Sequence, residues 1–83
     1  MPYIDREKRK DLDKVVELMT YFNVKADGDL NYILYSYFVK NFKMSYNVAK
    51  NYRAELMECA VEIGRRLLGP YEDEKIKING DVK

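Results

Sequence analysis

The chain has 83 residues, of which 15 are basic and 14 acidic, giving a formal net charge of +1. This length allows one domain with one hydrophobic core, and the balanced charge argues against a general nucleic-acid binder or a polybasic membrane contact, which carry a clear basic excess. One cysteine and no histidine exclude an intramolecular disulfide, a Cys/His metal site and a histidine-based catalytic triad within one chain.

The first predicted element is a helix over residues 6–22. Asp5 is placed as its N-cap, where a carboxylate accepts from the first free backbone amides, and Glu7 suits the positive end of the helix dipole. Asn23 is a residue at which the helix can end. The apolar side chains follow the three- and four-residue spacing of an amphipathic helix, and they are Leu12, Val15, Val16, Met19 and Phe22.

The second predicted helix, over residues 30–42, is apolar on nearly every face. It follows a turn in which Gly28 can take a positive φ and either Asp27 or Asp29 can cap a helix. A strand is the alternative, because aromatic and β-branched residues favour sheets, but the run is long for a strand and lacks a period of two. Its apolar side chains are Leu30, Tyr32, Ile33, Leu34, Tyr35, Tyr37, Phe38, Val39 and Phe42.

The composition of this second helix predicts self-association. A helix that is apolar on most faces is buried on most faces, and two neighbouring helices in a chain of 83 residues can hardly cover it. The alternative is that the eight tyrosines fill the rim of a small core. We expect a homo-oligomer, because tyrosine and phenylalanine are enriched at interfaces, and its candidate interface residues are Tyr32, Tyr35, Tyr37, Phe38 and Phe42.

The third predicted helix is the longest and spans residues 46–68, with Ser45 as its N-cap. Cys59 falls within its apolar stripe and is expected to be a buried small hydrophobe rather than a nucleophile, since no base accompanies it. Glu62 and Arg66 form a favourable pair one turn apart. The rest of the stripe is Ala49, Tyr52, Leu56, Ala60, Ile63 and Leu67.

A Gly-Pro pair then predicts the end of this helix. Gly69 suits the position after a helix, and Pro70 suits the first turn of the next one. A short C-terminal helix is expected over residues 71–78, followed by a turn at Asn79-Gly80. The predicted fold is therefore all-α, a small helical bundle of three main helices and a short fourth, in a single domain over residues 1–83.

Two clusters of side chains are candidate binding sites. Arginines can fork onto a phosphate or carboxylate and tyrosines can stack on a base, so Arg65, Arg66, Tyr71 and Lys75 are a candidate pocket for a small anion or nucleotide. The alternative is that both arginines pair with Glu62 and with the acidic residues 72–74. The second cluster resembles a helix-turn-helix over residues 39–53, in which the DNA contacts are Ser45, Asn47, Lys50, Asn51 and Arg53.

Several segments carry a resemblance to a known family. The chain opens Met1-Pro2-Tyr3-Ile4, continues with Gly28-Asp29-Leu30-Asn31-Tyr32, and has Glu58-Cys59-Ala60 upstream of Arg65-Arg66. It closes with PYEDEKI at residues 70–76 and NGDV at residues 79–82. It resembles a family of small uncharacterised proteins of bacteria, archaea and their phages. The resemblance implies no activity, and its distribution suggests a phage or host-defence context.

The resemblance also adds one residue to the candidate site. Asn31, Arg65 and Arg66 all belong to the recognisable segments, although a helical fold does not itself need those particular polar side chains. We hypothesise that they meet around a ligand or within an oligomer interface. Asn31 therefore joins the candidate ligand-binding residues.

The sequence indicates no arranged acid, base or nucleophile, and we expect a protein that is not an enzyme and binds no metal or cofactor. The N-terminal residues turn charged at Asp5, so a signal peptide is not expected, and no apolar run reaches membrane-spanning length. A lone Cys59 fits a reducing compartment. We therefore predict a cytoplasmic, non-enzymatic binding module that engages a protein or a small anionic ligand, with a DNA-binding regulator as the alternative.

Overall fold

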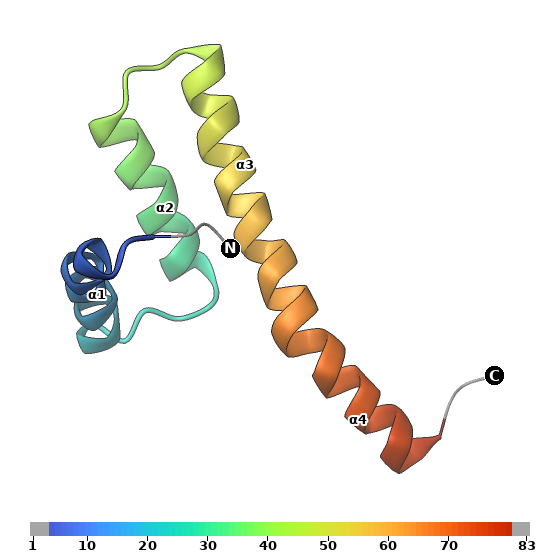
Figure 1. Ribbon diagram of the computed structural model, residues 1–83. Helices are drawn as coiled ribbons and strands as arrows, with labels where there is room; N and C mark the ends of the chain where they lie inside the picture. Colours follow the sequence, from blue (N-terminus) through green and yellow to red (C-terminus); the bar gives the residue numbers. More distant parts are fainter. Residues whose placement is uncertain (1–3, 81–83) are drawn as a thin grey trace. The chain divides into compact units, whose positions relative to one another are not determined.

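A computed structural model describes residues 4–80, and every regular element in that range is helical (Figure 1). The all-α prediction is confirmed. The chain divides into two units, the first up to Met44 and the second from Ser45 onward, and each is described by itself. The elements are α1 (Arg6–Tyr21), α2 (Gly28–Asn41), α3 (Tyr46–Ile63), the π-helical turn η1 (Gly64–Leu68) and α4 (Gly69–Asn79).

In the first unit, α1 begins at the predicted residue and ends one residue early. Asp5 occupies the N-cap position, but its side chain makes no capping hydrogen bond. The helix ends because Asn23 takes a left-handed conformation, with φ of 55°, which asparagine tolerates better than most residues. The Asn23 amide donates to the Thr20 carbonyl at 3.0 Å and closes the last turn.

The second helix of this unit begins earlier than the sequence indicated. The Asp27 carboxylate accepts a hydrogen bond from the Asp29 amide at 2.9 Å, so Asp27 is the cap and Gly28 already lies in the helix. Gly28 does not use the positive φ that glycine can take, since the one glycine with positive φ in the described chain is Gly80. The helix ends at Asn41 because Phe42 adopts an extended backbone.

The second unit is one continuous helical path from Tyr46 to Asn79 (Figure 1). Ser45 caps it as predicted, its Oγ accepting from the Val48 amide at 3.2 Å. At about 1.5 Å per residue the path is about 50 Å long. Within this unit, no second described helix lies beside it.

The predicted break at Gly69-Pro70 does not interrupt the helix. Proline has no amide hydrogen, and in a regular α-helix its ring clashes with the carbonyl four residues earlier, here that of Arg66. The turn before Pro70 is instead a π turn, in which the Gly69 amide donates to the Gly64 carbonyl five residues back. This wider turn lets α4 continue from α3 where the sequence predicted a separate helix over residues 71–78.

The helices bury almost nothing within the described chain. No apolar side chain in residues 4–80 is buried, and the one buried residue is Glu62, at 6% exposure. The expected burial of Cys59 was wrong, since its thiol-bearing side chain is exposed. Across the same residues, the structure contains no helix whose length and apolarity would let it cross a membrane.

Candidate functional site

The most tightly organised polar cluster surrounds Glu62, at the end of α3. The Glu62 carboxylate accepts a hydrogen bond from Arg65, whose Nη2 lies 2.5 Å from Oε1, and it forms an ion pair with Arg66, whose Nε lies 2.8 Å from Oε2. The arginine side chains remain 66% and 65% exposed, whereas the Glu62 side chain is 8% exposed. A buried carboxylate therefore holds two guanidinium groups whose outer faces reach solvent.

The charge state of Glu62 follows from these contacts. Burial by itself raises the pKa of a carboxyl group, because it disfavours the charged form. The hydrogen bond from Arg65 and the positive charges of Arg65 and Arg66 outweigh that effect, and the pKa of Glu62 falls below its usual value. The carboxylate is therefore ionised at neutral pH, and the three side chains together carry one net positive charge.

Of the other predicted ligand residues, Tyr71 and Lys75 contact each other on α4, whereas Asn31 lies on α2. Lys75 Nζ lies 5.7 Å from the centre of the Tyr71 ring, one turn earlier on α4, in a cation–π contact. Asn31 lies in the first turn of α2, where its amide donates to the Asp27 carbonyl at 3.3 Å. Asn31 thus belongs to the other unit.

The ion pairs of the two arginines match part of the alternative that the sequence offered. The predicted Glu62–Arg66 pair is present, and Arg65 joins it. Within the described part of the chain, the acidic residues 72–74 form one ion pair, between Glu74 and Lys77 at 3.9 Å, and neither arginine takes part in it. The arginines are therefore held by Glu62 alone among these carboxylates.

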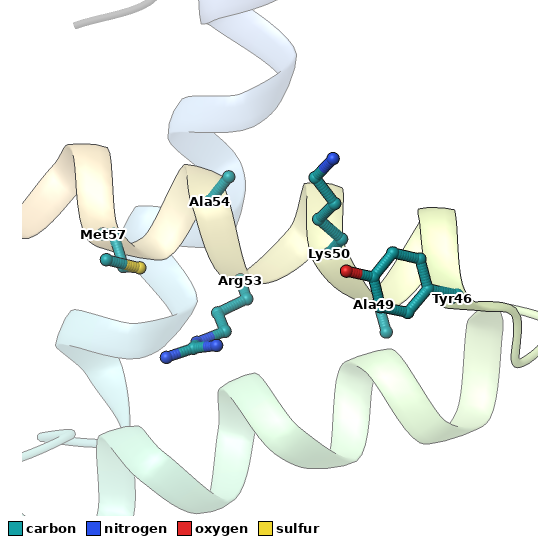
Figure 2. A pocket seen from close by; sticks show the side chains of 6 residues that line it. All are labelled: Tyr46, Ala49, Lys50, Arg53, Ala54 and Met57. Carbon is teal, nitrogen blue, oxygen red and sulfur yellow. The ribbon is translucent and has the colours of Figure 1, made fainter.

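A second candidate site is a hollow of about 340 Å³ on α3, shown in Figure 2. It holds two of the predicted DNA contacts, Lys50 and Arg53, which lie almost one turn apart. No acidic side chain lines it. The sequence analysis did not assign its apolar members to a binding site, although the spacing of three and four residues from Tyr46 to Met57 places them on one face. The lining residues are Tyr46, Ala49, Lys50, Arg53, Ala54 and Met57.

The predicted interface residues of α2 fall into two groups. At the end of the helix, the Phe38 and Phe42 rings stack at 5.5 Å between centroids, and Tyr37 meets Phe42 edge-on at 5.7 Å. Tyr32 and Tyr35, nearer the start, are 71% and 70% exposed. The aromatic residues of α2 thus form a local cluster and an open tyrosine surface.

The first unit also contains an apolar hollow of about 320 Å³ where α1 leads into α2. Its polar members are Thr20 and Lys25. Thr20 Oγ1 donates to the Val16 carbonyl at 2.9 Å, and the Lys25 amide donates to the Asp29 carboxylate at 3.3 Å. Both hydrogen bonds are local to the end of α1 and the turn that follows it. The remaining lining of the hollow is apolar and consists of Val16, Met19, Val24, Ala26 and Leu30.

Comparison with known proteins bears on this chain as a whole. Residues 1–82 match the family model described as "Domain of unknown function (DUF6899)". The chain belongs to the DUF6899 family. This agrees with the resemblance to a family of uncharacterised proteins that its terminal segments indicated. No curated protein and no solved structure matches this DUF6899 member significantly.

Proposed function

We propose that this DUF6899 member is a non-enzymatic helical binding module that works as a homo-oligomer and engages a protein or a small anionic ligand. The observation that carries the proposal is the absence of any buried apolar side chain in residues 4–80. A folded domain is normally held together by the burial of apolar surface. Here that surface is left available to a partner.

The exposed apolar side chains are large and numerous. Tyr46 is 79% exposed, Tyr32 71% and Tyr35 70%. Single exposed apolar residues are normal, but contiguous apolar patches on a soluble chain mark interaction sites. A second copy of the chain is a partner that is present wherever the protein is made, and most soluble oligomers are symmetric homo-oligomers.

The second unit supports the same proposal independently. Helices in proteins take most of their stability from packing an apolar face, and an isolated helix is marginal in water. The path from Tyr46 to Asn79 carries apolar residues along its whole length, among them Met57, Leu67 and Ile78, which are 56%, 65% and 68% exposed. Packing against a partner would supply the missing stabilisation.

The arginine pair supports the anionic ligand. Arg66 pairs with Glu62 through Nε and its side chain remains 65% exposed, and the planar guanidinium group is a fork that suits phosphate or carboxylate. The buried Glu62 restricts the rotamers of both arginines and so lowers the entropic cost of ordering them around a ligand. Tyr71 and Lys75 add a ring and a cation further along the same helical path.

The terminal motifs support two finer proposals about the family. The first is that the family has members in bacteria, archaea and phages. The second is that this protein works in the cytoplasm, a reducing compartment that suits the exposed thiol of Cys59. A host-defence component or a signalling nucleotide is then a reasonable partner to include in binding tests.

Sedimentation of the full chain over a dilution series tests assembly. We expect a homo-oligomer at micromolar concentration, and a monomer throughout that range would contradict the proposal. Thermal denaturation with inorganic phosphate and a panel of nucleotides tests the anion site, because a ligand that binds the folded state raises the melting temperature. Arg65→Ala with Arg66→Ala should abolish the rise, whereas Lys8→Ala with Arg9→Ala, on α1, should preserve it.

A DNA-binding regulator is the second candidate function. It is favoured by one observation, that Lys50 and Arg53 share a hollow with no acidic lining residue. DNA binding through phosphate contacts weakens steeply as salt rises. Binding of random duplex at low salt, lost on Lys50→Ala with Arg53→Ala, would support this function, and no binding at low salt would remove it.

A further inference from the structure

One face of the second unit carries a continuous row of side chains. Its members recur every three or four residues from the start of α3 to the last turns of α4, and they are Tyr46, Lys50, Arg53, Met57, Val61, Gly64, Leu68, Glu72 and Ile76. The large apolar members are between 46% and 79% exposed. The first half of this row contributes four of the side chains around the α3 hollow of Figure 2.

The π turn keeps this row on one face. From Gly64 the row advances by three steps of four residues each, and in an unbroken α-helix these would carry the side chain about 120° around the axis. The π turn takes up about one extra residue, which turns the following side chains back by about 100°. Ile76 therefore lies close to the line of Met57 and Gly64.

The charges on this row are separated by sign. Lys50 and Arg53 lie towards its N-terminal end, and Glu72, followed by Asp73, lies towards its C-terminal end. Among the residues that the structure describes, none of these four takes part in an ion pair. A second identical row laid antiparallel would bring opposite charges together, whereas a parallel row would bring like charges together, which disfavours pairing.

We propose that a second copy of this chain docks antiparallel along this row, with the two-fold axis beside Val61. The proposal rests on the homo-oligomer of the proposed function and specifies its face and register. Residues equally distant from Val61 then face each other, so that Lys50 meets the partner's Glu72 and Tyr46 meets the partner's Ile76. Both contacts occur twice, as a two-fold interface requires.

The same register fills the hollow on α3. Ala54 lies opposite the partner's Leu68, and Tyr46 lies opposite the partner's Ile76, so two apolar side chains of the second copy cover the apolar lining. The partner's Glu72 meets Lys50 at the hollow's polar edge. Gly64, where an added Cβ would meet nothing within 4 Å, lies next to the axis and lets the two helices approach closely.

The area of this face is sufficient for a specific interface. Residues 46–76 span about 45 Å, and a partner helix about 11 Å across would cover on the order of 500 Å² of each chain. The pair would bury on the order of 1,000 Å² in total, which is the lower limit for a specific interface.

Charge reversal tests the register. Lys50→Glu with Arg53→Glu, and separately Glu72→Lys with Asp73→Lys, should each weaken self-association in sedimentation by on the order of tenfold or more. A mixture of the two variants should restore it, because each then supplies the charge that the other lacks. Lys8→Glu with Arg9→Glu makes the same change of charge on α1 and should leave self-association unchanged.

Cysteine pairing provides a second measurement that does not depend on charge. In a Cys59→Ser background, Tyr46→Cys and Ile76→Cys should not form disulfide dimers alone but should form them when mixed and oxidised, because a disulfide requires closely apposed β-carbons. A Tyr46→Cys dimer without Ile76→Cys would indicate parallel docking and overturn the proposal. Self-association that survives both charge reversals unchanged would also overturn the antiparallel docking but would leave the homo-oligomer standing. A monomeric wild-type chain would overturn both the docking and the homo-oligomer.

Discussion

Replacement of Ser45 by alanine should destabilise the second unit by a measurable amount. The Ser45 hydroxyl accepts a hydrogen bond from the Val48 amide at 3.2 Å and so satisfies one of the free amides at the start of α3. Alanine leaves that amide to water, and loss of a serine N-cap costs about 1 kcal/mol. In a domain of this size, about 1 kcal/mol lowers the melting temperature by about 4–8 °C.

The chain offers a matched control for this cap. Asp5 occupies the same position at the start of α1, but its side chain makes no capping hydrogen bond. Asp5→Ala should therefore lower the melting temperature less than Ser45→Ala, and Ser45→Asp should largely preserve it because aspartate caps as well as serine. Thermal denaturation followed by circular dichroism, at one fixed protein concentration, measures all three variants. A loss for Asp5→Ala as large as that for Ser45→Ala would refute the reasoning.

Other predictions concern Glu62 and two glycines. Because the pKa of Glu62 is lowered in the folded chain, its ionised form contributes stability that is present above the usual pKa of 4.5 and is lost as pH falls through the folded value. The melting temperature of Glu62→Gln should therefore lie below that of wild type at neutral pH and approach it in acid, and a constant difference across that range would contradict the ion pairs. Gly80→Ala should destabilise by about 1 kcal/mol or more, because Gly80 has φ of 82°. Gly28→Ala should instead stabilise by about 0.4–1 kcal/mol, because Gly28 lies within α2 without a positive φ. Denaturant titrations measure the free energy of unfolding of both variants. Equal effects of the two changes would show that the backbone conformation of the glycine does not determine the effect of its replacement.

Much of the secondary structure could be predicted because its signals are local. The cap at Ser45, the end of α1 at Asn23 and the pair of Glu62 with Arg66 each depend on residues within four positions of one another. Such interactions form within a single turn of helix. The sequence interpretation was therefore accurate for these three local features.

The candidate site was only partly predictable. Sequence reasoning named Arg65 and Arg66 and their alternative partner Glu62, but it could not tell that Glu62 would be the one buried residue in the described chain. It named Lys50 and Arg53 without the hollow around them. Burial and concavity depend on which surfaces meet, and spacing along a chain does not contain that information.

The sequence by itself determined that this protein is all-helical and where α1 and α3 begin, at Arg6 and Tyr46. Only the tertiary structure decided that Pro70 lies within a continuous helical path, because a π turn could relieve the clash with the preceding turn. It also decided that the apolar stripe of α3 is exposed from Leu56 to Leu67, including Cys59, and half-buried at Ala49 and Tyr52. A helical period specifies which residues share a face, whereas burial requires another surface to pack against that face.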